Sequence, residues 1–233
     1  MTKVTHVLFD MDGLLLDTER VYTEVTAKIV SKYGKTYDWT LKAQMMGLKE
    51  RDAAELLVKT LEIPMTVDEY IVARRLGHAE MFPSCRPLPG VVRFVEHLHR
   101  HGIPMAVATS SHRDAFVLKT SENQELFKHF NHILCGDDVI PSTGKPPRGK
   151  PSPDLFIAAA ETINGDLSNP QSCLVFEDAP SGVQAALNAG MQVVWVPDVN
   201  LAQDPALVSS ASEVMLTLEH FKPEKFGLPP FDN

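Results

Sequence analysis

Two carboxylates, Asp10 and Asp12, stand directly after the apolar segment 4–9, and Gly13 follows them. The apolar segment is typical of a strand buried in a parallel sheet, and the carboxyl ends of such strands open into the ligand crevice of α/β folds. Two carboxylates there repel each other and lose solvation, so a cation between them is favoured. Mg²⁺ prefers such oxygen ligands beside a substrate phosphate. The alternative is an acidic turn in which the glycine supplies a positive φ.

A second apolar segment, residues 104–109, ends in the hydroxyls of Thr109, Ser110 and Ser111. Hydroxyls and free backbone N–H groups at a turn from strand to helix can bind a phosphate. The same residues can instead cap the helix that follows. We therefore interpret this segment as a candidate phosphate-binding site that needs support from other motifs in the chain.

A lysine in a proline-flanked loop, Lys150, could neutralise a phosphoryl oxygen. The alternative is a solvated loop lysine, and the loop holds a near-copy of the motif at Lys145. We expect Lys150 to reach the site because the motif Pro-Ser-Pro-Asp and an apolar helix over residues 155–163 follow it directly.

Adjacent carboxylates, Glu177 and Asp178, follow a third apolar segment at residues 173–176. Neighbouring side chains point in alternate directions, so one acid can face a metal while the other supports it. With Asp10 and Asp12, four acids are predicted at strand ends of a chain whose net charge is already −8. Such an arrangement favours a bound cation.

The elements that must position these residues follow a βαβ rhythm, which predicts an α/β fold with a parallel sheet. Five strands are expected, at residues 4–9, 104–109, 132–135, 173–176 and 192–196. The rhythm is broken between residues 19 and 85, where helical patterns are expected at 19–33, 41–46, 50–61 and 67–81. We predict a core of residues 1–18 and 86–233 with a helical cap, residues 19–85, which would exclude water from the site.

The amino-acid composition and the net charge exclude several classes of function. The 233 residues are 44% hydrophobic and 22% charged, as in ordinary globular proteins. A net charge of −8 argues against nucleic acid as a partner. Three scattered cysteines form neither a disulfide framework nor a metal motif, and no apolar segment reaches the roughly 20 residues of a membrane span. We expect a cytoplasmic monomer with no membrane association.

The four motifs Asp10-Met-Asp12-Gly, Thr109-Ser110, Lys150-Pro and Glu177-Asp178 resemble, in order and spacing, the haloacid dehalogenase-like superfamily of hydrolases. The insertion resembles the helical cap of its β-phosphoglucomutase-like branch. The segments FDMDGLLLDTE and LVFEDAPSGVQAALNAGMQVV are similar to the pseudouridine-5′-phosphatase and glycerol-phosphate phosphatase group. The resemblance implies a Rossmann-like parallel sheet flanked by helices, with an inserted all-helical cap.

The resemblance also implies a phosphatase mechanism through an aspartyl-phosphate. Asp10 would be the nucleophile and Asp12 the general acid and base. Thr109, the backbone N–H of Ser110 and Lys150 would bind the phosphoryl oxygens. Mg²⁺ would be held by Asp10, the Asp12 carbonyl and Asp178, with Glu177 as a ligand or supporting residue. The substrate would be a small phosphorylated metabolite.

Substrate choice is expected to lie in the cap, where Lys49, Arg51 and Tyr22 are potential contacts, although all could be surface or packing residues. We expect a nucleotide-like phosphate such as pseudouridine 5′-phosphate, or a sugar or polyol phosphate such as glycerol 3-phosphate. A phosphomutase is the first alternative, but Tyr22 stands where β-phosphoglucomutase-like enzymes have a histidine. A haloacid dehalogenase would have no use for Asp12 or Mg²⁺, and a catalytically silent binding module would be expected to lack a motif residue.

Overall fold

The computed structural model describes residues 2–45, 50–199 and 205–232. The chain divides into two compact units. The first, called here the α/β unit, consists of Met1–Asp17 and Arg86–Asn233. The second, called the helical unit, is Thr18–Cys85. Each unit is described by itself below.

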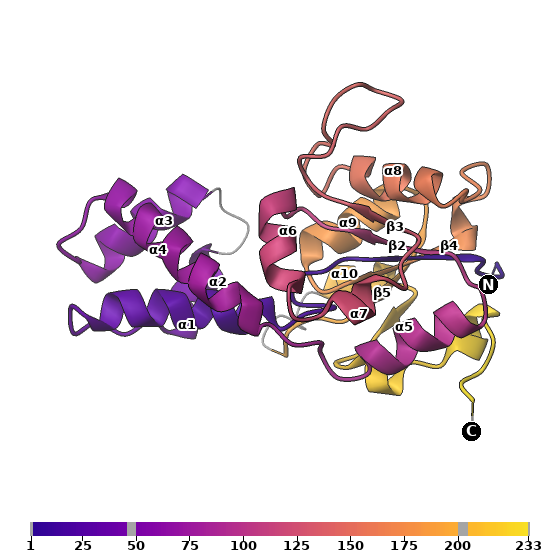
Figure 1. The fold of residues 1–233 in the computed structure, drawn as a ribbon, viewed down its shortest axis with the longest axis horizontal. Helices are drawn as coiled ribbons and strands as arrows, with labels where there is room; N and C mark the ends of the chain where they lie inside the picture. The colour runs from indigo at the N-terminus through magenta and orange to yellow at the C-terminus, as the bar shows by residue number, and fades with distance from the viewer. Residues whose placement is uncertain (1, 46–49, 200–204, 233) are drawn as a thin grey trace. The chain divides into compact units, whose positions relative to one another are not determined.

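The α/β unit is built on a parallel sheet in the order β3-β2-β1-β4-β5-β6 (Figure 1). The strands are β1 (His6–Phe9), β2 (Met105–Ala108), β3 (His132–Leu134), β4 (Cys173–Glu177), β5 (Gln192–Trp195) and β6 (Glu213–Val214). The first strand lies in the middle, with β2 and β4 on its two sides. The direction of winding therefore reverses beside β1, which is where open α/β sheets bind ligands.

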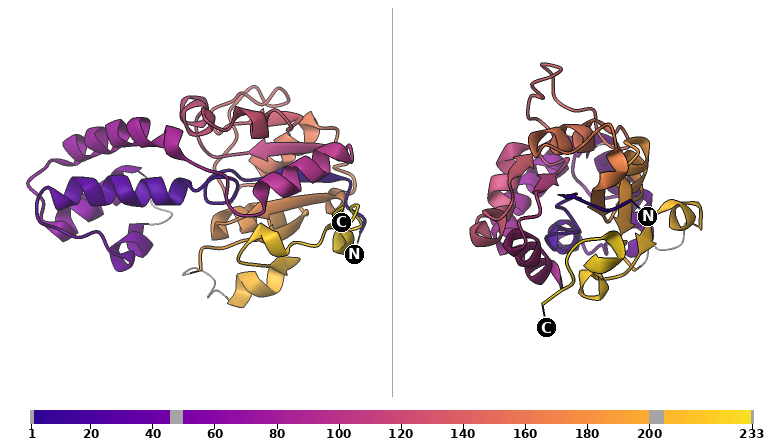
Figure 2. Two further views of the ribbon diagram at one scale, coloured as in Figure 1. Left: turned by 60° about the horizontal axis from the view of Figure 1, so that its bottom comes forward. Right: turned by 90° about the vertical axis from the view of Figure 1, so that its right-hand side faces the viewer.

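Helices cover both faces of the sheet (Figures 1 and 2). The strands β1, β2, β4 and β5 are almost entirely buried, whereas the edge strands β3 and β6 are partly exposed. On one face, α8 (Asp154–Thr162) and α9 (Pro180–Asn188) pack on side chains such as Leu8 and Val175. On the other face, α5 (Val91–Arg100) places Phe94 within an aromatic cluster. Its other rings are Phe9, Phe130, Phe176, Phe221 and Phe226. Leu8 and Phe9 thus point to opposite faces of the sheet, as expected for successive residues of a strand.

The helical unit contains α1 (Thr18–Ser31), α2 (Trp39–Met45), α3 (Glu50–Leu61), α4 (Val67–Met81) and the 3-10 turn η1 (Phe82–Ser84). Thr66 and Glu69 form a capping box that begins α4. Glu50 pairs with Arg74 and Arg75, which joins α3 to α4. At Gly77 an added Cβ would lie 2.7 Å from a methyl carbon of Val25, so the absent side chain allows α4 to approach α1 closely.

The structure confirms the predicted α/β class and all five expected strands, with ends that differ by up to two residues. It adds β6, α6 (Arg113–Thr120), α7 (Gln124–Phe127) and α10 (Pro205–Ser210), which were not predicted. In α6, Val117 and Leu118 are exposed while Lys119 is buried, so the helix lacks the apolar stripe that marks an amphipathic helix. Among the described residues, the helices are all too short or too polar to span a membrane.

Candidate active site

The site lies at the carboxyl ends of three neighbouring strands. Asp10 directly follows β1, Thr109 directly follows β2, and Glu177 is the last residue of β4. Because β1 lies between β2 and β4 in a parallel sheet, these ends meet at one edge. The sheet order thus gathers motifs that are more than 160 residues apart in the chain.

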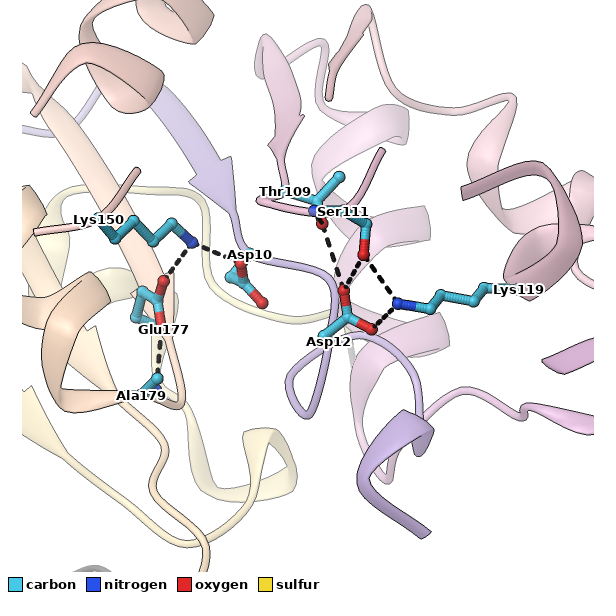
Figure 3. A network of polar contacts seen from close by, with 8 residues as sticks. All are labelled: Asp10, Asp12, Thr109, Ser111, Lys119, Lys150, Glu177 and Ala179. Atoms are coloured by element: carbon cyan, nitrogen blue, oxygen red, sulfur yellow. Dashed lines mark hydrogen bonds and ion pairs between the residues drawn. The ribbon is translucent and has the colours of Figure 1, made fainter. Parts of the chain in front are cut away.

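One half of the site is a buried cluster of Asp10, Lys150 and Glu177 (Figure 3). The Lys150 Nζ lies 2.5 Å from Asp10 Oδ1 and also pairs with Glu177 Oε1. Burial would lower the pKa of Lys150, but the two carboxylates outweigh it and raise that pKa. Lys150 is therefore an ammonium group held against the acid that follows β1.

Among these residues, Asp10 has a negative charge that burial disfavours. Burial raises its pKa to about 7; Lys150 opposes that shift, and the charges of Glu177 and Asp12 add to it. A further positive charge beside Asp10 would favour its ionised form. This is the electrostatic condition expected of a site that holds a cation.

Glu177 is fixed by its own turn. Its Oε2 accepts a hydrogen bond of 2.9 Å from the backbone N–H of Ala179. The carboxylate also occupies the space where a side chain at Gly182 would lie, since an added Cβ would be 1.7 Å from Glu177 Oε1. The glycine in the first turn of α9 is therefore required for Glu177 to reach Lys150.

The other half of the site holds the Asp12 carboxylate between two hydroxyls and a second lysine (Figure 3). Ser111 Oγ donates to Asp12 Oδ2 at 2.8 Å, and Thr109 Oγ1 lies 3.3 Å from the same oxygen. The Lys119 Nζ lies 2.5 Å from Asp12 Oδ1 and donates to Ser111 Oγ at 2.7 Å. The Lys119 side chain is 0% exposed. Asp10 and Asp12 are thus held by different lysines.

Lys119 is the main residue that the sequence analysis missed. It comes from α6, where it is one charged residue among several and carries no motif. The hydroxyl that joins the network is that of Ser111, whereas Ser110 is exposed. The backbone role expected for Ser110 remains a prediction.

Carboxylate oxygens of Asp10, Glu177 and Asp178 lie within 4.8 Å of one another. The backbone of Asp178 is anchored by Trp195, whose Nε1 donates to its carbonyl oxygen at 2.8 Å. Lys150 supplies one positive charge among these three carboxylates. The donor set and its negative charge fit a hard divalent cation such as Mg²⁺. Asp12, whose side chain turns to Lys119, would contribute through its carbonyl.

The remaining expected residues are placed as follows. Lys145 is exposed in its loop, so of the two loop lysines Lys150 is the one at the carboxylates. In the helical unit, Arg51 pairs with Asp68 and Glu55 on the surface. Tyr22 packs edge-on against His78 and Phe82. Lys49 lies outside the described residues. The substrate contacts expected of Arg51, Tyr22 and Lys49 remain predictions.

Acids at the ends of the central strands of an α/β sheet, with Lys150 between Asp10 and Glu177, are an arrangement typical of enzymes that bind and transfer a phosphoryl group. The comparisons give the family: the profile of the haloacid dehalogenase-like hydrolases matches residues 4–190. The chain belongs to this family, and the resemblance found in its motifs is confirmed.

Relatives of known name cover nearly the whole chain. The chain is 47% identical over 232 residues to (DL)-glycerol-3-phosphatase 1, mitochondrial, of Arabidopsis thaliana, covering 99% of this chain and 76% of that protein. It is 46% identical over 231 residues to a Drosophila melanogaster protein named as a probable pseudouridine-5′-phosphatase, covering 99% and 97%. A Thermotoga maritima crystal structure, described as a candidate β-phosphoglucomutase, is 30% identical with a TM-score of 0.75, covering 96% of each chain.

Proposed function

We propose that this protein is a Mg²⁺-dependent phosphatase that hydrolyses a small phosphomonoester through an aspartyl-phosphate on Asp10. The observation that carries the proposal is the separation of the two acids into different ion pairs. Asp10 lies against Lys150, and Asp12 lies against Lys119. Two acids so close in sequence can then play two roles, one as nucleophile and one as proton carrier.

In the first step, a carboxylate oxygen of Asp10 attacks the phosphorus of the substrate, and the bond from phosphorus to the ester oxygen breaks. Asp12 enters this step protonated, with the proton taken from water in the previous turnover, and gives it to the departing oxygen, so that an alcohol leaves. Lys150 holds a phosphoryl oxygen, where negative charge gathers in the transition state. The products of this step are the alcohol and a phosphorylated Asp10.

In the second step, water attacks the phosphorus and Asp12 takes one of its protons. The bond from phosphorus to the Asp10 oxygen breaks, which releases inorganic phosphate and restores the free carboxylate. Ser111 and Lys119 keep the Asp12 carboxylate in one orientation through both steps. Asp10, the Asp12 carbonyl and Asp178 would hold the Mg²⁺, with Glu177 beside them, and the bound ion would supply neutralisation of charge on the phosphoryl group.

The relatives named above support two substrate classes, a pseudouridine 5′-phosphate and a glycerol phosphate. The test is phosphate release from a panel with Mg²⁺ and with EDTA. The panel contains pseudouridine 5′-phosphate, uridine 5′-phosphate, glycerol 3-phosphate, 2-deoxyglucose 6-phosphate and β-glucose 1-phosphate. Phosphate release that requires Mg²⁺ supports the proposal. Conversion of β-glucose 1-phosphate to glucose 6-phosphate without phosphate release would favour the mutase. No turnover of any substrate in the panel would contradict a phosphatase with this substrate range.

Contacts from the helical unit are the second part of the proposal. If Arg51 and Tyr22 bind the alcohol part of the substrate, Arg51→Gln and Tyr22→Phe should raise KM and leave kcat nearly unchanged. An exposed arginine elsewhere, Arg100→Gln, is the matched control for Arg51. Unchanged KM values in both variants would assign these residues to surface and packing roles.

The cellular setting is proposed as cytoplasmic and the protein as a monomer. One of the relatives is mitochondrial by name, so imaging of the tagged full chain is the decisive measurement for the compartment. Light scattering of the purified protein tests the monomer.

A further inference from the structure

A cluster of two histidines and an aspartate lies in the α/β unit and includes none of the catalytic motifs. His97 and His101 stand one helical turn apart at the end of α5, and Asp232 lies beside them. One potential ligand atom from each residue lies within 4.8 Å of the others. Histidines at positions i and i+4 of a helix share one face, which is a common way to present two imidazoles to one metal ion.

The hydrogen bonds of the two rings settle which nitrogen of each can bind a metal. Pro229 O lies 2.9 Å from His97 Nε2, and a carbonyl oxygen only accepts, so Nε2 carries the hydrogen. In the neutral ring this leaves the lone pair on His97 Nδ1. By the same argument, His101 Nδ1 donates to the carbonyl oxygen of His97 at 2.9 Å, so its lone pair is on Nε2.

This arrangement is the one that metal-binding histidines show. Their second ring nitrogen normally donates to a carbonyl or carboxylate, which fixes the tautomer and the orientation of the ring. Here both rings meet that condition through backbone carbonyls. The lone pairs of His97 Nδ1 and His101 Nε2 are therefore available to a metal ion without any change of tautomer.

His97 supplies an independent sign of a ligand. The residue is 0% exposed, and its Nδ1 is a buried polar atom without a hydrogen-bond partner. Buried polar atoms are nearly always paired, so an unpaired one calls for a missing partner. A metal ion would supply the acceptor for this lone pair.

Asp232 completes the donor set. Its Oδ1 lies 3.8 Å from His101 Nε2, while its other oxygen pairs with Arg100 Nη2 at 3.0 Å. The neighbouring Phe231 packs on the His97 ring, with centroids 4.8 Å apart, and lies under Arg93. The segment that carries Asp232 is thus already packed on α5.

We propose that His97, His101 and Asp232 form a binding site for a borderline divalent cation, of which Zn²⁺ is the probe of choice. Two imidazoles and one carboxylate are a donor set that Zn²⁺ takes, whereas Mg²⁺ prefers oxygen ligands. Zn–N bonds are about 2.1 Å long, so the three atoms need to move together by roughly an ångström. The exposed side chains of His101 and Asp232 leave room for a water as the fourth ligand. The ion would tie the segment 229–232 to α5.

The test is Zn²⁺ binding measured in millimolar Mg²⁺, so that the carboxylate site of Asp10 and Asp178 is occupied. The full-length protein, freed of metal with EDTA, competes with a chromophoric chelator for Zn²⁺. We expect binding of one Zn²⁺ ion, weakened at least about 10-fold by Asp232→Asn and about 100-fold by His101→Ala. Both variants change exposed side chains, so the fold should persist. Co²⁺ in place of Zn²⁺ should give the visible absorption of a four-coordinate ion, and His101→Ala should abolish it.

Two controls separate this site from others. His99→Ala removes a histidine of the same helix whose ring packs on His129, and it should leave Zn²⁺ affinity unchanged. Asp178→Asn should also leave it unchanged, which would exclude the carboxylate site. The proposal is overturned if the protein takes up no Zn²⁺ in Mg²⁺, or if His101→Ala and Asp232→Asn bind Zn²⁺ as tightly as the parent chain. None of these outcomes depends on phosphatase activity.

Discussion

The ammonium group of Lys119 lies 2.5 Å from Asp12 Oδ1, although the two residues are 107 positions apart in the chain. The lysine is fully buried, and 22% of the Asp12 side chain is exposed. Burial of a lysine is costly unless the charge is paired and hydrogen-bonded, and here Asp12 and Ser111 provide both. The pairing fixes the carboxylate that we assign to proton transfer, so Lys119 is a positioning residue for the proposed reaction.

Replacement of this lysine should impair the step that needs a proton. For Lys119→Met we expect kcat/KM to fall about 100-fold with an alkyl phosphate, because the proton carrier loses its fixed orientation. With p-nitrophenyl phosphate the loss should be much smaller, since that leaving group departs without protonation. kcat/KM is the proper measure because it covers the steps only up to the first departure of product.

The matched control is Lys128→Met, which removes an exposed lysine paired with Glu125. It should leave both substrates unaffected. Lys119→Arg keeps the charge and should recover part of the activity. Equal losses for the alkyl and p-nitrophenyl substrates in Lys119→Met would contradict a role in orienting the proton carrier.

A methyl group at Gly182 should damage the site by displacing the Glu177 side chain. The added Cβ of Gly182→Ala would overlap the Glu177 carboxylate, which must then leave Lys150. We expect kcat/KM to fall roughly 100-fold through misplacement of the lysine, with stability lower by about 1–3 kcal/mol. Gly149→Ala, where an added Cβ meets nothing within 4 Å, is the control. If both variants show the same kinetics and urea midpoint, the argument from close packing is wrong.

The phosphatase activity should depend on a metal ion held by the acids at the ends of β1 and β4. EDTA should abolish phosphate release, and added Mg²⁺ should restore it. In Asp178→Asn the Mg²⁺ concentration for half-maximal activity should rise at least about 10-fold, because one carboxylate of the cluster is lost. Asp166→Asn changes an exposed aspartate that binds Ser168 and should not alter that concentration. Activity that persists in EDTA would rule out the metal requirement.

The nucleophile can be tested by the mildest change. Asp10→Asn keeps the shape of the side chain but removes its nucleophilic oxygen, so phosphate release should fall at least about a thousandfold. Circular dichroism should show an intact fold. A properly folded variant that kept about a few percent of the parent activity would exclude Asp10 as the nucleophile.

The sequence by itself determined five of the strands in the sheet and the residues at their ends. Continuous apolar segments such as 173–176 predict buried parallel strands, and acids or hydroxyls directly after them fall at one edge of any such sheet. Asp10, Thr109 and Glu177 could therefore be assigned to one site without coordinates. These signals are local, because they depend on which residue follows a strand.

Only the tertiary structure decided which partner each acid takes. Lys119 lies in a helix without an apolar stripe, and its buried side chain pairs with Asp12, which lies 107 positions away, so local pattern gives no sign of it. Lys150 differs from Lys119 in this respect, because the residues that follow it already favoured it over Lys145, and the structure places it at Asp10. The pairing of His97 and His101 with Asp232 has the same origin, since it joins a helix to a segment more than 130 residues further along. Contacts between distant segments are set by packing, which short-range patterns do not encode.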